Sequence, residues 1–144
     1  MIEALGLTKR YGPVKALDDF TLVARPGEIV GLVGHNGAGK TTFANIVSGL
    51  LRPDSGRVLI DGAPPRSARH RLGIAPQHIA LYPTVTPRET LRLFGGLQGL
   101  RRRELGRATD EIAEALKITD FLDRRVGVLS GGQQRRVQAA AAMI

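Results

Sequence analysis

One run of residues determines the class of fold: Gly34-His35-Asn36-Gly37-Ala38-Gly39-Lys40-Thr41. It matches the phosphate-loop pattern G-x-x-x-x-G-K-[ST] at every fixed position. The apolar, partly β-branched residues 28–33 precede it and predict a buried strand. Residues 42–51 follow, with apolar side chains on one face of a predicted helix. Strand, glycine loop and helix form the context that this motif requires.

The spacing within the loop suits a polyphosphate. Glycines allow backbone dihedrals that point successive N–H groups inward, and the helix that starts near Gly39 adds the positive end of its dipole. Lys40 is placed to reach the β- and γ-phosphates, and the Thr41 hydroxyl is placed to bind Mg²⁺. The alternative is a glycine-rich turn without a ligand. The dinucleotide pattern G-x-G-x-x-G fails after Gly37, so a dinucleotide site is not expected.

The composition favours a chain with a hydrophobic core but without disulfides. The 144 residues are 42% hydrophobic, contain no cysteine and have no apolar stretch long enough to span a membrane. The N-terminus shows no secretory signal. A formal net charge of +8 is compatible with nucleic acid, anionic lipid or nucleotide partners. Aromatic residues make up only 4%, which argues against a stacking platform for single-stranded nucleic acid.

Strand patterns dominate the first half of the chain and helix patterns the second. Besides 28–33, four short runs predict strands, at residues 2–8, 20–23, 57–60 and 72–75. Residues 86–89 form a capping box with proline at the first helical position, and a second helix is expected over 103–117. We therefore expect an α/β core at residues 1–77, a helical subdomain at 78–130 and a further helix at 131–144.

A second motif, Leu129-Ser130-Gly131-Gly132-Gln133, precedes a run of strong helix formers. Ser130 is placed to cap that helix. The two glycines remove side chains from its first turn, so bare N–H groups can meet an anion.

Together these motifs resemble the ATP-binding domain of ABC (ATP-binding cassette) transporters, and the resemblance covers essentially all 144 residues. Residues 34–41 resemble the Walker A loop, and residues 129–133 are identical to the signature L-S-G-G-Q. Gln77 resembles the Q-loop glutamine, which in the family contacts Mg²⁺ and the attacking water and couples to the membrane subunit. Tyr11 resembles the aromatic residue that stacks on adenine, with a plain core or turn tyrosine as the alternative.

The resemblance implies a phosphate-loop NTPase core of α/β class, incomplete here, with antiparallel strands at the N-terminus and an inserted helical subdomain. It implies ATP and Mg²⁺ as ligands, with Lys40 and Gln77 in catalysis and Thr41 and Gln77 at the metal. The residues that it implies for nucleotide binding are Tyr11, Gly34, His35, Asn36, Gly37, Ala38, Gly39, Lys40, Thr41, Thr42, Ser130, Gly131, Gly132 and Gln133.

The implied partners are a second ATP-binding subunit in a head-to-tail dimer and a membrane permease. Residues 80–91 are similar to the exporter branch that works with ABC-2 type permeases, which predicts a peripheral position at the cytoplasmic face of the cell membrane. No nucleic acid is expected. The alternatives are a soluble ABC-type ATPase acting on ribosomes or nucleic acid, which the charge of +8 favours, and a nucleotide-binding remnant without catalysis.

The family pattern continues with a Walker B aspartate, a catalytic glutamate and a switch histidine, and none of these follows Gln133. Phosphoryl transfer to water needs a group that orients the water. We therefore expect these 144 residues alone to bind MgATP weakly and to hydrolyse it negligibly.

Overall fold

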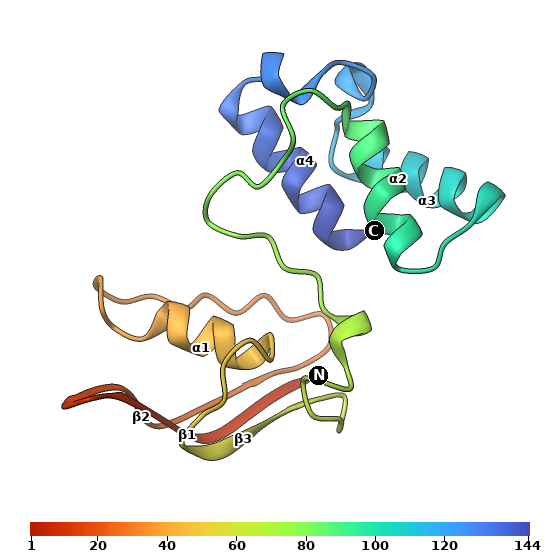
Figure 1. Cartoon of the computed structure of the whole chain (residues 1–144). Coiled ribbons are helices and arrows are strands. Elements are labelled where there is room, and N and C mark those ends of the chain that lie inside the picture. The colour runs from red at the N-terminus through yellow and green to blue at the C-terminus, as the bar shows by residue number, and fades with distance from the viewer. The chain divides into compact units, whose positions relative to one another are not determined.

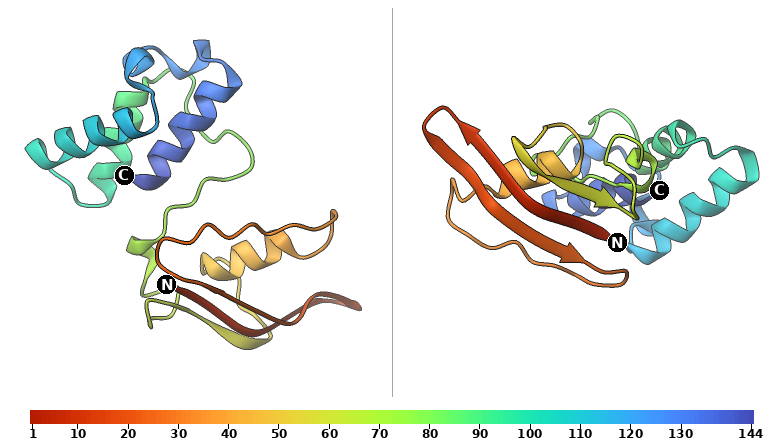
Figure 2. Two further views of the ribbon diagram at one scale, coloured as in Figure 1. Left: turned by 180° about the vertical axis from the view of Figure 1, so that it is seen from behind. Right: turned by 90° about the horizontal axis from the view of Figure 1, so that it is seen from below.

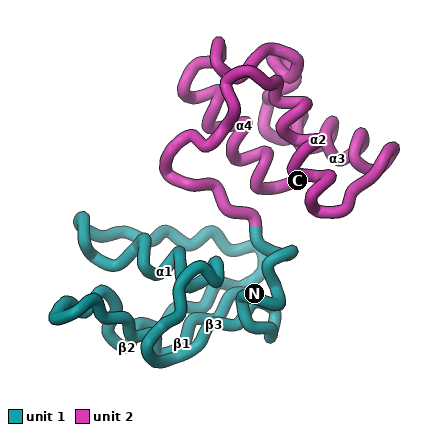
Figure 3. Tube along the Cα trace, viewed as in Figure 1, with its two compact units in different colours: residues 1–72 teal, residues 73–144 magenta.

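The computed structural model describes all 144 residues (Figure 1 and Figure 2). The chain divides into two compact units, Met1–Leu72 and Gly73–Ile144 (Figure 3). The first contains β1 (Ile2–Tyr11), β2 (Val14–Ala24), α1 (Lys40–Val47), β3 (Ser55–Ile60) and the short 3-10 helix η1 (Arg69–Arg71). The second contains α2 (Pro87–Leu97), α3 (Arg102–Ala115), η2 (Thr119–Phe121), η3 (Val126–Val128) and α4 (Gly131–Met143). Each unit has its own hydrophobic core.

The first unit is a three-stranded antiparallel sheet with α1 packed against it. The strand order is β2-β1-β3, and Ile2 of the central strand lies opposite Ala24 on one side and Ile60 on the other. Ile46 of α1 is buried against Leu7 and other side chains of the sheet. This packing fixes the direction of α1 and therefore the place where its N-terminus opens.

Two predicted strands are wrong. Residues 28–33 are irregular, and Ile29 and Val33 are almost fully exposed, at 101% and 96%. Residues 72–75 are irregular as well, and Ile74 is 55% exposed. An apolar run forms a buried strand only where a neighbouring strand pairs with its backbone and another layer covers its side chains. The sheet β2-β1-β3 provides no pairing strand for residues 28–33 or 72–75, so these two runs stay irregular.

The other predicted strands form, and the first two are longer than the sequence indicated. Residues 2–8 extend to Tyr11, and residues 20–23 grow into β2, because the turn after Tyr11 joins both strands into one hairpin. Pairing supplies backbone hydrogen bonds that extend strands beyond the part their own pattern predicts.

The second unit is helical. The predicted capping box is confirmed: Thr86 N–H donates to the Glu89 carboxylate at 2.8 Å, and Glu89 N–H donates to the Thr86 hydroxyl at 3.2 Å. The helices α2, α3 and α4 share one core, which includes Leu91 and Val137. No helix in the structure combines the length and apolar character that crossing a membrane requires. The expected boundaries after residues 77 and 130 stay predictions, since the observed units divide after Leu72.

Candidate functional site

The phosphate loop has the backbone that its glycines predict at two positions. Gly37 has φ of 90° and Gly39 has φ of 83°, both in the left-handed region that favours glycine. A Cβ on Gly39 would lie 2.2 Å from the carbonyl oxygen of Ala16, so this position also needs glycine for space. Gly34 does not have a positive φ, and a Cβ there would lie 3.0 Å from the Cβ of Ala38 within the loop.

Lys40 closes the loop upon itself. Its Nζ donates to the carbonyl oxygens of Gly34 and His35, at 2.6 and 2.8 Å. Both acceptors belong to the loop, so the ammonium group lies over the same backbone that would surround a phosphate. These bonds are exposed, and a more strongly charged acceptor can replace the carbonyl oxygens without any burial cost.

The N-terminus of α1 provides free donors. The first hydrogen bond of the helix runs from Phe43 N–H to the Gly39 carbonyl, at 2.8 Å. The N–H groups of Lys40, Thr41 and Thr42 precede it and have no acceptor within the helix. No acidic residue lies in the first turn of α1. The positive end of the helix dipole is therefore available to an anion from outside.

The remaining loop residues are accessible. His35, Asn36 and Ala38 are exposed, as is Thr41, while Thr42 is half-buried. The His35 ring bonds through Nδ1 to the Asn36 carbonyl oxygen at 2.8 Å, which turns the ring along the loop. An open surface of this kind can receive a ligand as large as a nucleotide.

Tyr11 lies at the end of β1, opposite Val14 across the hairpin turn. Its side chain is 50% exposed, so it is not a core residue. Its stacking on a base stays a prediction.

The second motif forms the start of α4, and the predicted cap is confirmed. Gln133 N–H donates to the Ser130 hydroxyl at 3.3 Å, and Ser130 N–H donates to the Gln133 side-chain oxygen at 2.9 Å. The Gln133 half of this box was not predicted, although the S-x-x-Q spacing indicates it. A Cβ on Gly131 or Gly132 would meet nothing within 4 Å, so the first turn is open.

Gln77 is exposed on the irregular segment between η1 and α2. The backbone on both sides of it is bonded to one buried side chain of α4. Gln138 donates through Nε2 to the Pro76 carbonyl oxygen, and its Oε1 accepts from Ala80 N–H at 3.0 Å. Sequence reasoning missed Gln138; the available signal was an amide in a run of alanines on the buried side of a helix.

The candidate residues fall into two sets, one in each unit. Tyr11 and residues 34–42 belong to Met1–Leu72, whereas Gln77 and residues 130–133 belong to Gly73–Ile144. In the first unit Gly39 lies against Ala16 of the hairpin that carries Tyr11, and in the second unit Gln138 ties the Gln77 segment to α4. No group of three or more His, Cys, Asp or Glu side chains could hold a metal ion by itself.

The acidic groups with perturbed pKa values lie outside both sets. The hydrogen bond from Lys9, at 2.6 Å, lowers the pKa of Asp54. The hydrogen bond from Arg88, at 2.7 Å, lowers the pKa of Asp123 in the same way. These are surface ion pairs that stabilise the charged form of each carboxyl group.

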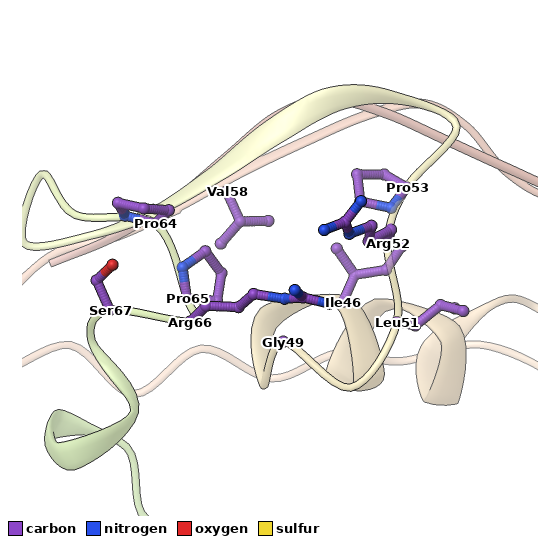
Figure 4. Close-up of a pocket in the computed structure, with 10 residues that line it drawn as sticks. All are labelled: Ile46, Gly49, Leu51, Arg52, Pro53, Val58, Pro64, Pro65, Arg66 and Ser67. Carbon is purple, nitrogen blue, oxygen red and sulfur yellow. The ribbon is translucent and has the colours of Figure 1, made fainter.

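A hollow of about 390 Å³ lies between α1 and β3, away from the phosphate loop. Figure 4 shows Ile46 and Val58 on its two facing sides. None of the candidate residues lines it, so it is not part of the site.

Comparison with known proteins gives one consistent result. The chain is 42% identical to a daunorubicin resistance ATP-binding protein, DrrA2, of Streptomyces coeruleorubidus, over 99% of this chain and 46% of that protein. It is 39% identical to Nod factor export ATP-binding protein I of Sinorhizobium fredii, over 99% of this chain and 43% of that protein. The chain spans about half the length of the curated relatives it matches.

A solved ATP-binding subunit of an ABC transporter superposes with a TM-score of 0.84 at 29% identity, covering 99% of this chain and 61% of that one. The predicted α/β phosphate-loop fold, with N-terminal antiparallel strands and a helical part, is thereby confirmed. The model of the ABC transporter family matches residues 17–144. The chain therefore belongs to the ABC transporter family.

Proposed function

We propose that this chain is the ATP-binding part of an exporter, in which ATP binding and hydrolysis drive transport across a membrane. The observation that carries the proposal is the start of α1, where the phosphate loop, Lys40 and three unpaired N–H groups converge without any acidic side chain. A helix start of this composition attracts a polyanion, and no nearby negative charge repels a phosphate group.

The residues present fit a triphosphate. Lys40 can exchange its two carbonyl acceptors for phosphate oxygens, and Gly37 leaves room because a Cβ there would meet nothing within 4 Å. The proposed contacts of the phosphates are residues 34–42. Tyr11, exposed on its hairpin, is proposed to stack on the base.

Mg²⁺ is proposed as the cofactor, held by the Thr41 hydroxyl and the Gln77 side chain. Bound Mg²⁺ supplies positive charge to the polyphosphate. Thr41 is exposed at the first turn of α1, and Gln77 is exposed on its segment, so both oxygen atoms are free to act as ligands. Gln77 is also proposed to orient the attacking water, with Lys40 stabilising the phosphoryl group in transfer.

The start of α4 is proposed to bind the ATP held by a second subunit in a head-to-tail dimer. Ser130, Gly131, Gly132 and Gln133 supply the capped, open helix start for this contact. Two positive helix ends then share one polyanion, and each reduces the cost of bringing the other close.

The names of the relatives support export over a role on ribosomes or nucleic acid, because they describe drug resistance and Nod factor export. We propose a permease subunit, of ABC-2 type, as the partner. The chain would then lie peripherally at the cytoplasmic face of the cell membrane.

A nucleotide titration of the complete gene product tests the proposal. Lys40→Ala is expected to weaken ATP binding about tenfold to a hundredfold, since a charge-assisted hydrogen bond is worth about 1.5–3 kcal/mol. Lys15→Ala is the matched control, because Lys15 is an exposed lysine of the same unit that pairs only with Asp18. ATP affinity that is equal in parent and Lys40→Ala would contradict the nucleotide site.

Transport needs a second measurement. The complete gene product and its permease, reconstituted together in vesicles, are expected to move a drug-like substrate outward only when ATP is present. Lys40→Ala should abolish this movement, and Lys15→Ala should leave it intact. If the protein binds ATP normally but shows no ATP-dependent transport, the nucleotide site would be supported and the role as an exporter would be refuted.

A further inference from the structure

We infer that Gln138 is a positioning residue that holds the Gln77 segment in place for the ATPase reaction. The inference rests on the proposed function of Gln77. It extends that function to a side chain on another element, 61 positions away in the printed sequence.

The geometry of the amide is specific. Pro76 offers only a carbonyl oxygen, which must accept, whereas Ala80 offers its N–H, which must donate. An amide side chain carries a donor and an acceptor side by side, so these two partners fix its orientation. The two bonds tie together both ends of the five residues 76–80, and Gln77 lies between them.

Packing does little to hold the same segment. Pro76, Gln77 and Ala80 are exposed, and residues 72–75 before them form no strand. A hollow of about 240 Å³ borders the segment, lined by Pro76, Ala80, Gln138 and neighbouring side chains of α2 and α4. Within residues 76–80, the two hydrogen bonds of Gln138 therefore hold the backbone, and Leu81 packs against the core directly after them.

Gln138 itself is well anchored. It is 7% exposed and lies on α4 next to Val137, which is fully buried in the core of the second unit. Because Ser130 caps the start of α4, the same helix carries the open N-terminus at one end and the anchor of the Gln77 segment along its length. A displacement of α4 would therefore displace the segment as well.

Removing the amide should loosen the segment without unfolding the unit. The Pro76 carbonyl and the Ala80 N–H belong to exposed residues, so water can replace their lost bonds. Methionine is unbranched and of similar length, which makes Gln138→Met the least disruptive substitution. Gln138→Glu is the second variant, since its carboxylate can still accept from Ala80 N–H but cannot donate to Pro76.

The experiment measures steady-state ATP hydrolysis by the complete gene product. Gln138→Met is expected to lower kcat about tenfold to a hundredfold, because a catalytic group misplaced by about 1 Å costs that much. The KM for ATP should change less than about twofold, since the phosphate loop is untouched. Amide hydrogen exchange at Ala80 should be faster in the variant, which reports the lost bond directly.

A double-mutant cycle separates positioning from stability. In a Gln77→Ala background, Gln138→Met should lower kcat no further, because the group that it positions is absent. Thr109→Val is the control: it removes a buried hydroxyl that bonds to Leu105 on α3, at 2.7 Å, and should leave kcat unchanged.

Several outcomes would overturn the inference. They are additive losses in the cycle, an unchanged kcat despite faster exchange at Ala80, and a loss in Thr109→Val as large as in Gln138→Met. If Gln138→Met melts without cooperativity, Gln138→Glu takes its place with the same expected loss in kcat. Exchange at Ala80 is then not expected to rise, because the carboxylate still accepts from the Ala80 N–H. A Gln77→Ala variant with normal kcat would instead refute the proposed role of Gln77, while the effect of Lys40→Ala on ATP binding would still stand.

Discussion

Gly39→Ala is expected to destabilise the phosphate loop through two separate effects. The first is conformational: a φ of 83° costs an alanine about 1–2 kcal/mol relative to glycine. The second is steric. The new Cβ would lie 2.2 Å from the Ala16 carbonyl oxygen and 3.0 Å from Leu17 Cδ2, whereas ordinary contacts begin near 3.4 Å. Because the closer atom belongs to the backbone of β2, relief requires a backbone shift, which typically costs about 1–3 kcal/mol.

Gly37→Ala separates the two effects. Its φ of 90° imposes a similar conformational cost, but its Cβ would meet nothing within 4 Å. The difference between the two variants in local unfolding free energy should therefore equal the steric part alone, about 1–3 kcal/mol.

The measurement is native-state hydrogen exchange of the amides of α1, residues 40–47, in the complete gene product. The free energy of local opening is obtained for the parent and for each variant under the same conditions. Equal losses in Gly39→Ala and Gly37→Ala would refute the reasoning, since the contact with Ala16 would then contribute nothing. A smaller loss in Gly39→Ala would refute it as well.

Two further predictions concern the second unit. Leu91 is 0% exposed in the core, so Leu91→Ala should lower the unfolding free energy of this unit by about 2–5 kcal/mol. Hydrogen exchange of the amides of α2 measures this loss. A loss below about 1 kcal/mol would mean that the site is not close-packed. The pKa of Asp123 is lowered by the hydrogen bond from Arg88, so the folded state binds its proton more weakly than the unfolded state. The contribution of this pair should be present above about pH 4 and lost as pH falls through the lowered pKa. The difference in thermal unfolding between the parent and Asp123→Asn should therefore be largest near pH 7 and shrink as the pH falls below about 4. A difference that stays constant with pH would contradict this prediction.

The parts of the structure that the sequence predicts correctly are those whose determinants lie within a few residues. Thr86 and Glu89 are three positions apart, so a short window contains both halves of this cap. Ser130 and Gln133 have the same spacing, although only the Ser130 half was predicted. The backbone of Gly37 and Gly39 likewise follows from the loop pattern alone.

The parts that the sequence does not predict depend on distant partners. An apolar run such as 28–33 is compatible with a buried strand, but whether it becomes one depends on strands elsewhere in the sheet. The bonds of Gln138 reach residues 58 and 62 positions away, and no local pattern contains that information. Reading Gln138 as an ordinary helix former therefore hides its contact with the Gln77 segment.

The caps of α2 and α4 differ by a single charge. Glu89 and Gln133 occupy the same position after the cap residue, and each returns a side-chain oxygen to the backbone N–H of that residue. The carboxylate of Glu89 neutralises the positive N-terminal end of α2. The neutral amide of Gln133 makes the same bond in α4 but does not neutralise the positive N-terminal end of that helix. A carboxylate at position 133 would keep the capping bond and would not weaken the fold, but its negative charge would oppose the polyanion that we propose to bind at this helix end.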